Sequence, residues 1–411
     1  MTKATYNDIC LISGGQMRRI LNLGMHPYAD TFVNKDQLGM TEPIFPLECL
    51  LNSDSGQIQL AYLTDAFDRY NLYAYSYTSS NSNFARNHWK EYYKTIQRDY
   101  NIKDSIVIEI GANDGFLSEF FLRENNKVIA VDSSKEMCEI SARKGLTAIN
   151  KIFDLEVSTS LVNDFGKAEL VIANNVFNHS NDPVDFAMGV SNMMSEDGLF
   201  VFELPYWKST FESNKFDQIY HEHVSYFTVK SSYHLLKKAG LDLVDFEIVD
   251  YHGGSLRVFA KLSVDNYSNV KVDSAIQEEE NVGLFKVETY ERWFSVLRNQ
   301  RDVFLKKLYD LKISHPDYKI IGVGAAAKAN TFLNFYNIDG TVMDFITDSS
   351  PHKQGKYTPL TRIPIEDDNI FEKYDKVFAV ILSWNISASL KQILLDINPN
   401  IKFITTYDET N

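Results

Sequence analysis

The chain holds only three cysteines in 411 residues, and their positions exclude the two structures that cysteine usually builds. Cys10, Cys49 and Cys138 are odd in number, lie far apart and form no C-x-x-C pair. A disulfide framework needs paired cysteines, and a structural zinc site needs several thiolates close together. The sequence therefore predicts neither a disulfide framework nor a metal site.

Long apolar runs are also missing. No stretch approaches the roughly 18 consecutive apolar residues of a membrane-spanning helix. Residues 1–8 carry no apolar signal core. From these absences we expect a cytoplasmic protein without a membrane partner.

Positive charge is in short supply. The chain has 41 Lys and Arg against 55 Asp and Glu, a net charge of -14 with histidine neutral. Proteins hold nucleic-acid phosphates mainly with Lys and Arg, so this balance argues against a nucleic-acid partner. A local basic pocket for one diphosphate remains compatible with it.

The remaining composition, 44% hydrophobic and 23% charged, is typical of a globular protein. A chain of 411 residues is expected to form two or three domains rather than one core. Its pattern divides into a small irregular β-rich N-terminal lobe, a segment of alternating strands and helices, a polar helical connector and a second strand-turn-helix unit. We place these parts at residues 1–75, 76–262, 263–317 and 318–411.

The alternating segment predicts an α/β fold. We expect strands at 106–110, 128–131, 169–173, 199–203, 243–249 and 255–261, with helices at 84–99 and 230–239. Strands that alternate with helices predict a doubly wound, mostly parallel, Rossmann-like sheet, and Gly253 with Gly254 indicates an antiparallel hairpin at its edge. Strands near 319–324, 344–348 and 377–382 predict a Rossmann-like C-terminal domain as well.

The most informative stretch is residues 106–115, IVIEIGANDG. Gly111 and Gly115 permit positive φ and let a ligand approach the backbone, and the helix that begins at Phe116 offers unpaired N–H groups. The next apolar strand stops at Asp132, whose carboxylate could accept both hydroxyls of a ribose. Together the two strands predict an adenosine-type ligand.

That ligand is either S-adenosylmethionine or a dinucleotide. The turn lacks the third glycine of G-x-G-x-x-G, which packs a helix beneath a pyrophosphate. Glu109 would repel phosphates, but it suits a ligand that carries an ammonium group and a sulfonium. These features favour S-adenosylmethionine; a glycine-rich turn that binds nothing is the remaining alternative.

A second strand enters a turn of small residues at 319–330, KIIGVGAAAKAN. Lys328 would reach back toward phosphates, and Asn330 could donate from the first helical turn. One turn could thus hold a cofactor and the other a nucleotide-activated substrate. A solvated helix lysine is the alternative for Lys328.

Candidate chemistry lies at residues 218–227, QIYHEHVSYF. Tyr220, Glu222 and His223 could supply an acid, an orienting group and a base if the segment lines a cleft. His221 and His223 could instead share one side of a strand and bind a metal, or the segment could be purely structural. His179 follows a strand, where doubly wound folds bind ligands, although it could equally be a cap or turn histidine.

The chain closely resembles the bacterial nucleotide-deoxysugar C-methyltransferases, nearly end to end. The resemblance rests on seven segments: EIGANDG at 109–115, ANNVFNH at 173–179, ELPY at 203–206, FDQIYHEHVSY at 216–226, GGSLR at 253–257, GVGAAAKAN at 322–330 and PHKQGK at 351–356. It implies that a 4-keto deoxysugar on a nucleoside diphosphate is deprotonated beside its ketone, and that the enolate attacks the methyl group of S-adenosylmethionine.

The resemblance also implies residue roles. His223 looks like the base, Tyr220 and Glu222 like its enolate-stabilising and orienting neighbours, and His179 and Tyr75 like further cleft groups. The cofactor would be bound by Glu109, Gly111, Asn113, Gly115, Asp132 and Asn174. The nucleotide sugar would be bound in the C-terminal domain by Gly324, Lys328, Asn330 and Lys353.

The resemblance fails in the N-terminal lobe. Family members carry a zinc module with two cysteine pairs, whereas the corresponding positions here read Cys10 with Ser13, and Asn52 with Ser55. Cys49 is displaced from the pattern, so a tetrahedral zinc should not form. We expect the lobe to fold without metal and the methyl-transfer residues to be unaffected.

Two other functions stay open on the sequence. One is methyl transfer to oxygen, or to a different nucleotide-linked acceptor. The other is a catalytically silent subunit that binds a nucleotide sugar, although the intact set of Tyr220, Glu222 and His223 argues against it.

Overall fold

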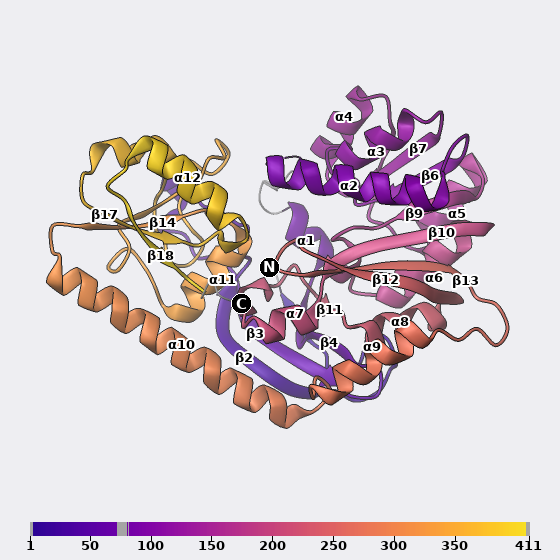
Figure 1. Ribbon diagram of the computed structural model, residues 1–411, viewed down its shortest axis with the longest axis horizontal. Coiled ribbons are helices and arrows are strands. Elements are labelled where there is room, and N and C mark those ends of the chain that lie inside the picture. Colours follow the sequence, from indigo (N-terminus) through magenta and orange to yellow (C-terminus); the bar gives the residue numbers. More distant parts are fainter. Residues whose placement is uncertain (1–2, 72–79, 81, 408–411) are drawn as a thin grey trace.

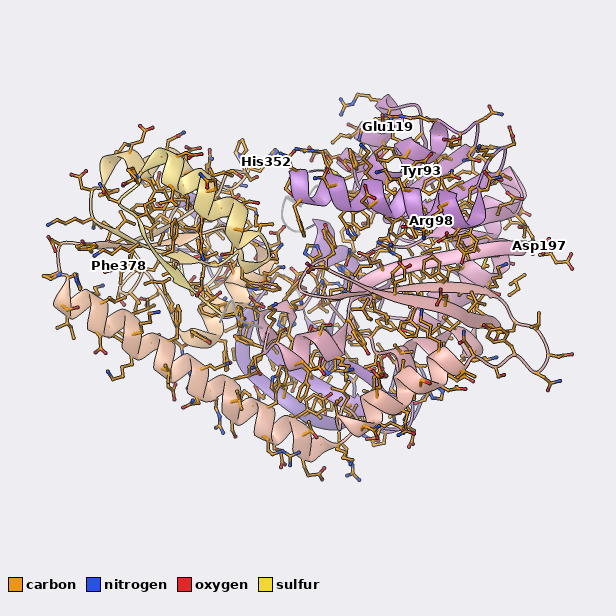
Figure 2. The ribbon with its side chains drawn as sticks, in the orientation of Figure 1. Tyr93, Arg98, Glu119, Asp197, His352 and Phe378 are labelled. Atoms are coloured by element: carbon orange, nitrogen blue, oxygen red, sulfur yellow. The ribbon has the colours of Figure 1, made fainter. Side chains whose placement is uncertain are left out.

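The computed structural model describes residues 3–71, 80 and 82–407 of the chain (Figure 1). The predicted Tyr75 lies outside the described residues. The fold is the predicted α/β type. Figure 2 places Asp197, at one end of the central sheet, and Phe378, in the C-terminal sheet, at opposite ends of the molecule. Within the described part of the chain, no helix is both long and apolar enough to cross a membrane.

The central sheet has seven strands in the order β12-β13-β10-β9-β6-β7-β8. The five strands β10, β9, β6, β7 and β8 are parallel to one another. At the other edge, β13 and β12 form the predicted antiparallel hairpin. The strands are β6 (Ile106–Ile110), β7 (Lys127–Asp132), β8 (Thr147–Asn150), β9 (Ala168–Ile172), β10 (Met194–Pro205), β12 (Leu241–Val249) and β13 (Ser255–Leu262).

Helices cover both faces of this sheet, because its inner strands are apolar on both sides. In β6, Val107 packs with the cluster under α2 and α3, whereas Ile108 packs with the cluster under α5, α6 and α8 (Figure 1). The helices are α2 (Asn83–Tyr100), α3 (Phe116–Leu122), α4 (Lys135–Arg143), α5 (Leu155–Phe165), α6 (Pro183–Met193), α7 (Trp207–Glu212) and α8 (Val229–Lys238).

The N-terminal lobe is β-rich, as predicted. A two-stranded sheet pairs β1 (Ala4–Tyr6) with β5 (Tyr62–Thr64), and α1 (Ala66–Asn71) follows it. A four-stranded sheet has the order β11-β4-β3-β2, with β2 (Arg18–Pro27), β3 (Ile44–Asn52), β4 (Gln57–Leu60) and β11 (Ser225–Tyr226). Since β11 begins two residues after His223, its pairing with β4 ties the candidate catalytic segment to this lobe.

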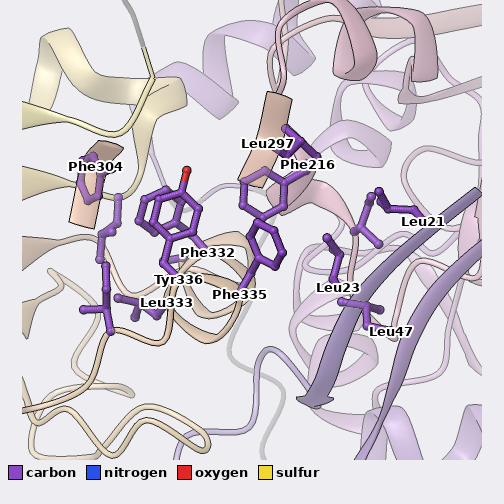
Figure 3. Packing of buried hydrophobic residues seen from close by; sticks show 14 of the residues in the cluster. Leu21, Leu23, Leu47, Phe216, Leu297, Phe304, Phe332, Leu333, Phe335 and Tyr336 are labelled. Atoms are coloured by element: carbon purple, nitrogen blue, oxygen red, sulfur yellow. The ribbon is translucent and has the colours of Figure 1, made fainter. Parts of the chain in front are cut away.

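The connector forms two helices, α9 (Val270–Asn281) and α10 (Val287–Ser314). Helix α10 runs from beneath β2 to the C-terminal domain (Figure 1). One continuous apolar cluster joins the three parts: Leu21 and Leu47 from the lobe, Phe304 from α10 and Phe332 from α11 are all members (Figure 3). This shared core fixes the lobe and the C-terminal domain against each other.

The C-terminal sheet has five parallel strands in the order β16-β15-β14-β17-β18. They are β14 (Lys319–Val323), β15 (Phe345–Thr347), β16 (Ile365–Glu366), β17 (Val377–Ile381) and β18 (Lys402–Thr405), and the helices are α11 (Ala327–Tyr336) and α12 (Ser387–Ile397). This is the second Rossmann-like unit that the sequence predicts.

Candidate functional site

A cavity of about 310 Å³ opens at the carboxyl ends of β6, β7 and β9, where doubly wound sheets bind ligands. His179 lines the same cavity. Of the predicted cofactor residues, the following five line it: Glu109, Gly111, Asn113, Asp132 and Asn174.

The glycine turn below this cavity adopts the backbone that its sequence predicts. Gly111 and Gly115 have φ of 69° and 71°, a region that favours glycine. A Cβ at Gly111 would lie 2.8 Å from Val176, and one at Gly115 would lie 2.5 Å from Leu146. Gly115, the N-cap of α3, therefore acts by letting the helix pack closely on its neighbours.

The carboxylate of Asp132 holds the turn in place. Its Oδ2 accepts a hydrogen bond from the backbone N–H of Asn113, and its Oδ1 accepts one from that of Ser134, both at 2.8 Å. Burial raises the pKa of Asp132 above its ordinary value. Each oxygen of a carboxylate has a further acceptor position, which is what a ribose hydroxyl requires.

Glu109 is buried at the floor of the cavity. Its Oε2 accepts a hydrogen bond of 2.5 Å from the Ser118 hydroxyl. Burial raises the pKa of Glu109 to about 8. A cation placed against it would favour the ionised form and lower that pKa, so the site suits a positively charged ligand group.

Asn174 gives the clearest indication that a polar ligand fits. Both its Oδ1 and Nδ2 are buried and lack a hydrogen-bond partner among the described residues, although the side chain lines the cavity. Orphaned buried amides are costly, and a ligand with both donors and acceptors would satisfy them. The residues present therefore fit S-adenosylmethionine, which carries an ammonium group, a carboxylate and an adenosine.

His223 forms the centre of a second cluster next to the cavity. Its Nδ1 lies 2.9 Å from the backbone oxygen of Gln218, which can only accept, so Nδ1 carries the hydrogen and Nε2 carries the lone pair. The Tyr220 hydroxyl donates to that lone pair at 2.7 Å. Burial lowers the pKa of His223 to about 3, so the ring is neutral.

His179 links the two clusters. It ends the short 3-10 helix at residues 177–179, and its ring centroid lies 5.0 Å from that of His223. Burial, with the nearby His223, lowers the pKa of His179 well below its usual value. Because His179 also lines the cavity, its ring lies between the lining of the cavity and His223.

The neighbours of His223 point in different directions. Glu222 Oε1 accepts from the backbone N–H of Ala29 at 3.2 Å, and burial raises the pKa of Glu222 to about 7. The ring of His221 packs edge-on against Tyr28 and Phe45. Residues 221–224 form a turn rather than a strand, so His221 and His223 do not share one side as the metal-binding alternative requires.

Arg69, in α1, also contacts this site, although the sequence analysis missed it. Its guanidinium donates to Oδ1 of Asn181 at 2.8 Å, to the backbone oxygen of His179 at 3.1 Å and to that of His221 at 3.5 Å. One buried side chain thus joins the two histidine segments. No local sequence pattern marks it, because its partners lie 110 to 152 residues away.

The turn of the C-terminal domain repeats the geometry of the first. Gly324 N–H donates to the Thr347 oxygen at 2.7 Å, as Gly111 N–H does to the Val131 oxygen. The Ala325 N–H donates to Oδ2 of Asp348 at 2.8 Å, the same arrangement that Asn113 and Asp132 form. The two nucleotide-type turns of the chain are therefore built alike.

The predicted substrate residues on this turn have different surroundings. Asn330 donates to the backbone oxygen of Ala29 at 2.5 Å, and Lys353 donates to that of Ala325 at 2.8 Å. Both side chains thus make contacts within the protein. Lys328 instead contacts Asn385, at 3.3 Å, and its charge acts on His223.

Comparison with known proteins agrees with this architecture. Residues 84–245 match the family described as methyltransferase domain, and residues 250–406 match the C-methyltransferase C-terminal domain. The C-methyltransferase NovU of Streptomyces niveus is 26% identical over 387 residues, which cover 93% of this chain and 91% of that protein.

Solved structures resemble only part of the chain. The magnesium protoporphyrin IX methyltransferase of Synechocystis PCC 6803, with bound S-adenosylhomocysteine, is 14% identical over 43% of this chain and 83% of its own, at a TM-score of 0.36. A S-adenosylmethionine-dependent methyltransferase from Clostridium acetobutylicum ATCC 824 is 17% identical over 48% and 96%, at 0.35. Both scores are too low to add to the assignment. From its matched domains and its near full-length relative, the chain is a methyltransferase that uses S-adenosylmethionine and a homologue of the C-methyltransferase NovU.

Proposed function

We propose that the protein methylates a carbon beside the ketone of a nucleoside-diphosphate 4-keto-deoxysugar, with His223 as the base that forms the enolate. The observation that carries the proposal is the tautomer of His223. Its Nδ1–H is fixed on the Gln218 oxygen, so the lone pair of Nε2 faces Tyr220 and lies beside the cavity-lining His179.

The first step is proton removal from the sugar carbon. In the described state the Tyr220 hydroxyl covers Nε2 of His223. Rotation of that hydroxyl toward a ketone oxygen uncovers the base and places a donor where negative charge develops. The C–H bond breaks, Nε2 takes the proton, and the electron pair moves into the enolate, whose oxygen accepts from Tyr220.

The second step forms the new carbon–carbon bond. S-adenosylmethionine would supply an electrophilic methyl group, whose bond to sulfur breaks as the new bond forms and leaves S-adenosylhomocysteine. The protein's task is to align the carbanionic carbon with that group, which the 5.0 Å separation of the His179 and His223 rings supports. The burial of His223 limits the access of bulk water that would compete in protonating the enolate.

The test is a methylation assay with S-adenosylmethionine and a panel of nucleoside-diphosphate 4-keto-6-deoxysugars, read by mass spectrometry. We expect a product heavier by one CH₂ from the wild type, and at least about a hundredfold less from His223→Ala. His315→Ala, at the C-cap of α10 outside the segments that carry the resemblance, is the control. Absence of methylated product from every ketosugar, with S-adenosylmethionine bound, would overturn the proposal.

Solvent exchange separates carbon from oxygen methylation. With S-adenosylhomocysteine in place of the methyl donor, carbon methylation requires wash-in of solvent deuterium beside the ketone, and His223→Ala should abolish it. A methylated product without wash-in in the wild type would point to transfer to oxygen instead.

A further inference from the structure

Two lysine side chains, one from the central domain and one from the C-terminal domain, contact one tryptophan ring. Lys215, just before the 3-10 turn at residues 216–218, places Nζ 4.4 Å from the ring centroid of Trp384. Lys328, in the first turn of α11, places Nζ 4.6 Å from the same centroid. Since both distances share one centroid, the two nitrogens lie no more than about 9 Å apart.

Carboxylates lie near these two ammonium groups: Asp217 acts on both, and Asp250 acts on Lys215. Oδ2 of Asp217 also accepts a hydrogen bond of 2.7 Å from Nε1 of Trp384. Lys328 has a hydrogen bond of 3.3 Å to Oδ1 of Asn385, so both ammonium groups keep donors that an anion could use. Burial lowers the pKa of Lys215, and burial opposed by Asp217 lowers that of Lys328 to about 8.

The backbone at His252 and Gly253, next to the Trp384 ring, adopts positive φ angles, as backbone at ligand sites often does. His252 has a φ of 53°, and its Nδ1 is buried without a partner among the described residues. The next residue, Gly253, has a φ of 83°, and a Cβ there would lie 2.6 Å from Trp384 and 3.2 Å from Lys215. Strained turns of this kind persist where the surrounding structure needs them, often at ligand sites.

The cluster lies near the proposed base. Burial and, more weakly, the charge of Lys328 both lower the pKa of His223. An anion bound by Lys328 would offset that charge and make His223 a stronger base. Anion binding at Lys328 and proton removal by His223 would then be coupled through the charge of this lysine.

The negative charge of the whole chain bears on the role of Lys215 and Lys328. A net charge of -14 repels anions, so an anionic ligand needs local cations to be held. The N-terminus of α11 has no side-chain cap, and it adds a partial positive charge beside Lys328. Two ammonium groups on a rigid aromatic plate suit a ligand with two adjacent anionic groups.

We propose that Lys215 and Lys328, on the ring of Trp384, bind the diphosphate of the nucleotide sugar, one ammonium group to each phosphate. The identity of the ligand rests on the proposed function. The site differs from the turn at Gly324 that the sequence indicates, because it also takes a lysine from the central domain. A bound diphosphate would therefore join the two domains.

The test is calorimetric titration with inorganic pyrophosphate, uridine diphosphate and thymidine diphosphate. We expect each of Lys215→Met and Lys328→Met to weaken binding at least about tenfold, the scale of one charge-assisted hydrogen bond. The double variant should weaken it further. Lys230→Met is a matched control, because Lys230 lies 4.6 Å from the Phe285 centroid but pairs with Glu280, and it should leave the affinity unchanged. Thermal unfolding verifies that each variant is folded.

The outcomes separate this site from the proposed function. Unchanged diphosphate affinity in the folded double variant, or no diphosphate binding by the wild type, overturns the site. Methylation of a ketosugar with an unchanged KM in both lysine variants overturns the site but leaves the proposed function standing. Lysine-dependent diphosphate binding without methylation of any ketosugar supports the site and counts against the proposed function.

Discussion

The Tyr220 hydroxyl lies 2.7 Å from Nε2 of His223, so the proposed base is covered by the group that we expect to stabilise the enolate. The hydrogen bond cannot be made the other way round, because Nδ1 holds the ring hydrogen against the Gln218 oxygen. The pair therefore acts as a unit: the phenol must leave the imidazole before either group can act on a substrate.

We predict that Tyr220→Phe lowers kcat by about 10² or more while leaving KM and the melting temperature little changed, because it removes the enolate donor but not the ring packing. Steady-state kinetics and thermal unfolding measure both. Tyr93→Phe is the control, since the Tyr93 hydroxyl donates to Glu124, which is remote from His223 in the structure. A Tyr220→Phe enzyme with wild-type kcat would contradict a role for the phenol in the reaction.

Two glycines with the same backbone allow a test of the cofactor turn. Gly115 and Gly14 have φ of 71° and 76°, but a Cβ at Gly115 would lie 2.5 Å from Leu146, whereas nothing lies within 4 Å of one at Gly14. We predict that Gly14→Ala costs about 1 kcal/mol of stability and leaves S-adenosylmethionine affinity intact. Gly115→Ala should in addition weaken that affinity about tenfold or more, by calorimetry. Equal affinities in the two variants would refute this reading of the turn.

Local pattern predicted most of the fold. The strands at 106–110, 128–131 and 377–382 carry uninterrupted apolar β-formers and appear as β6, β7 and β17. The short β8, TAIN, has no such run, and the two-residue β16 exists only by pairing with β15. Their positions depend on neighbours that a one-dimensional pattern does not contain.

The residues of the candidate site also divide into those that local sequence indicates and those that depend on tertiary contacts. Gly111, Gly115 and Asp132 are recognisable because their chemistry and their neighbours in sequence act together. Arg69 and Lys215 act through contacts across the fold, to His179 and Trp384, that no spacing encodes. A side chain whose role depends on tertiary contacts is found only after the chain is folded.

Glu222 gives a prediction at alkaline pH. Its folded pKa is raised from 4.5 to about 7, chiefly by burial, and Oε2 has no partner among the described residues. A raised carboxyl pKa stabilises the fold below pH 4.5, and that contribution is lost as pH rises through about 7. Glu222→Gln, which cannot ionise, should therefore be more stable than the wild type near pH 8 by on the order of 3 kcal/mol. Near pH 4 the two should be alike, and chemical denaturation at both pH values decides.

His221 gives the opposite prediction at acidic pH. Burial and the nearby His26 lower its pKa from 6.5 to about 3, although the backbone of Phe45 and of His26 acts in the opposite direction. Its stabilising contribution is present above pH 6.5 and is lost as pH falls toward 3. His221→Phe should therefore lose stability more slowly below pH 6, by about 1.4 kcal/mol per pH unit for one proton. His352→Phe, at an exposed position, should keep the wild-type slope, and identical slopes in all three proteins would disprove the assignment.

The N-terminal lobe holds a hydrogen-bonded cluster at the four positions that correspond to the zinc ligands of the resembled family. Asn52 is its centre: Oδ1 accepts from the Ser55 hydroxyl at 2.8 Å, from the Ser55 N–H at 2.9 Å and from the Ser13 hydroxyl at 3.5 Å. Cys10 Sγ lies 3.4 Å from the Ser55 oxygen. The two turns that a metal would bridge are thus joined by one buried amide, which offers a physical account of how the lobe is held together without thiolates.

We predict that Asn52→Ala lowers the free energy of unfolding by about 2–4 kcal/mol, because it leaves the buried hydroxyl and N–H of Ser55 without their acceptor. Asn22→Ala, in an exposed amide that bonds to Glu48 and to the Gly24 N–H, should cost less than about 1 kcal/mol. Urea unfolding measures both. A chelator should not change the melting temperature of the wild type, since an amide network releases nothing to it. Loss of stability on chelation, together with a small effect of Asn52→Ala, would show that a metal rather than this network holds the lobe.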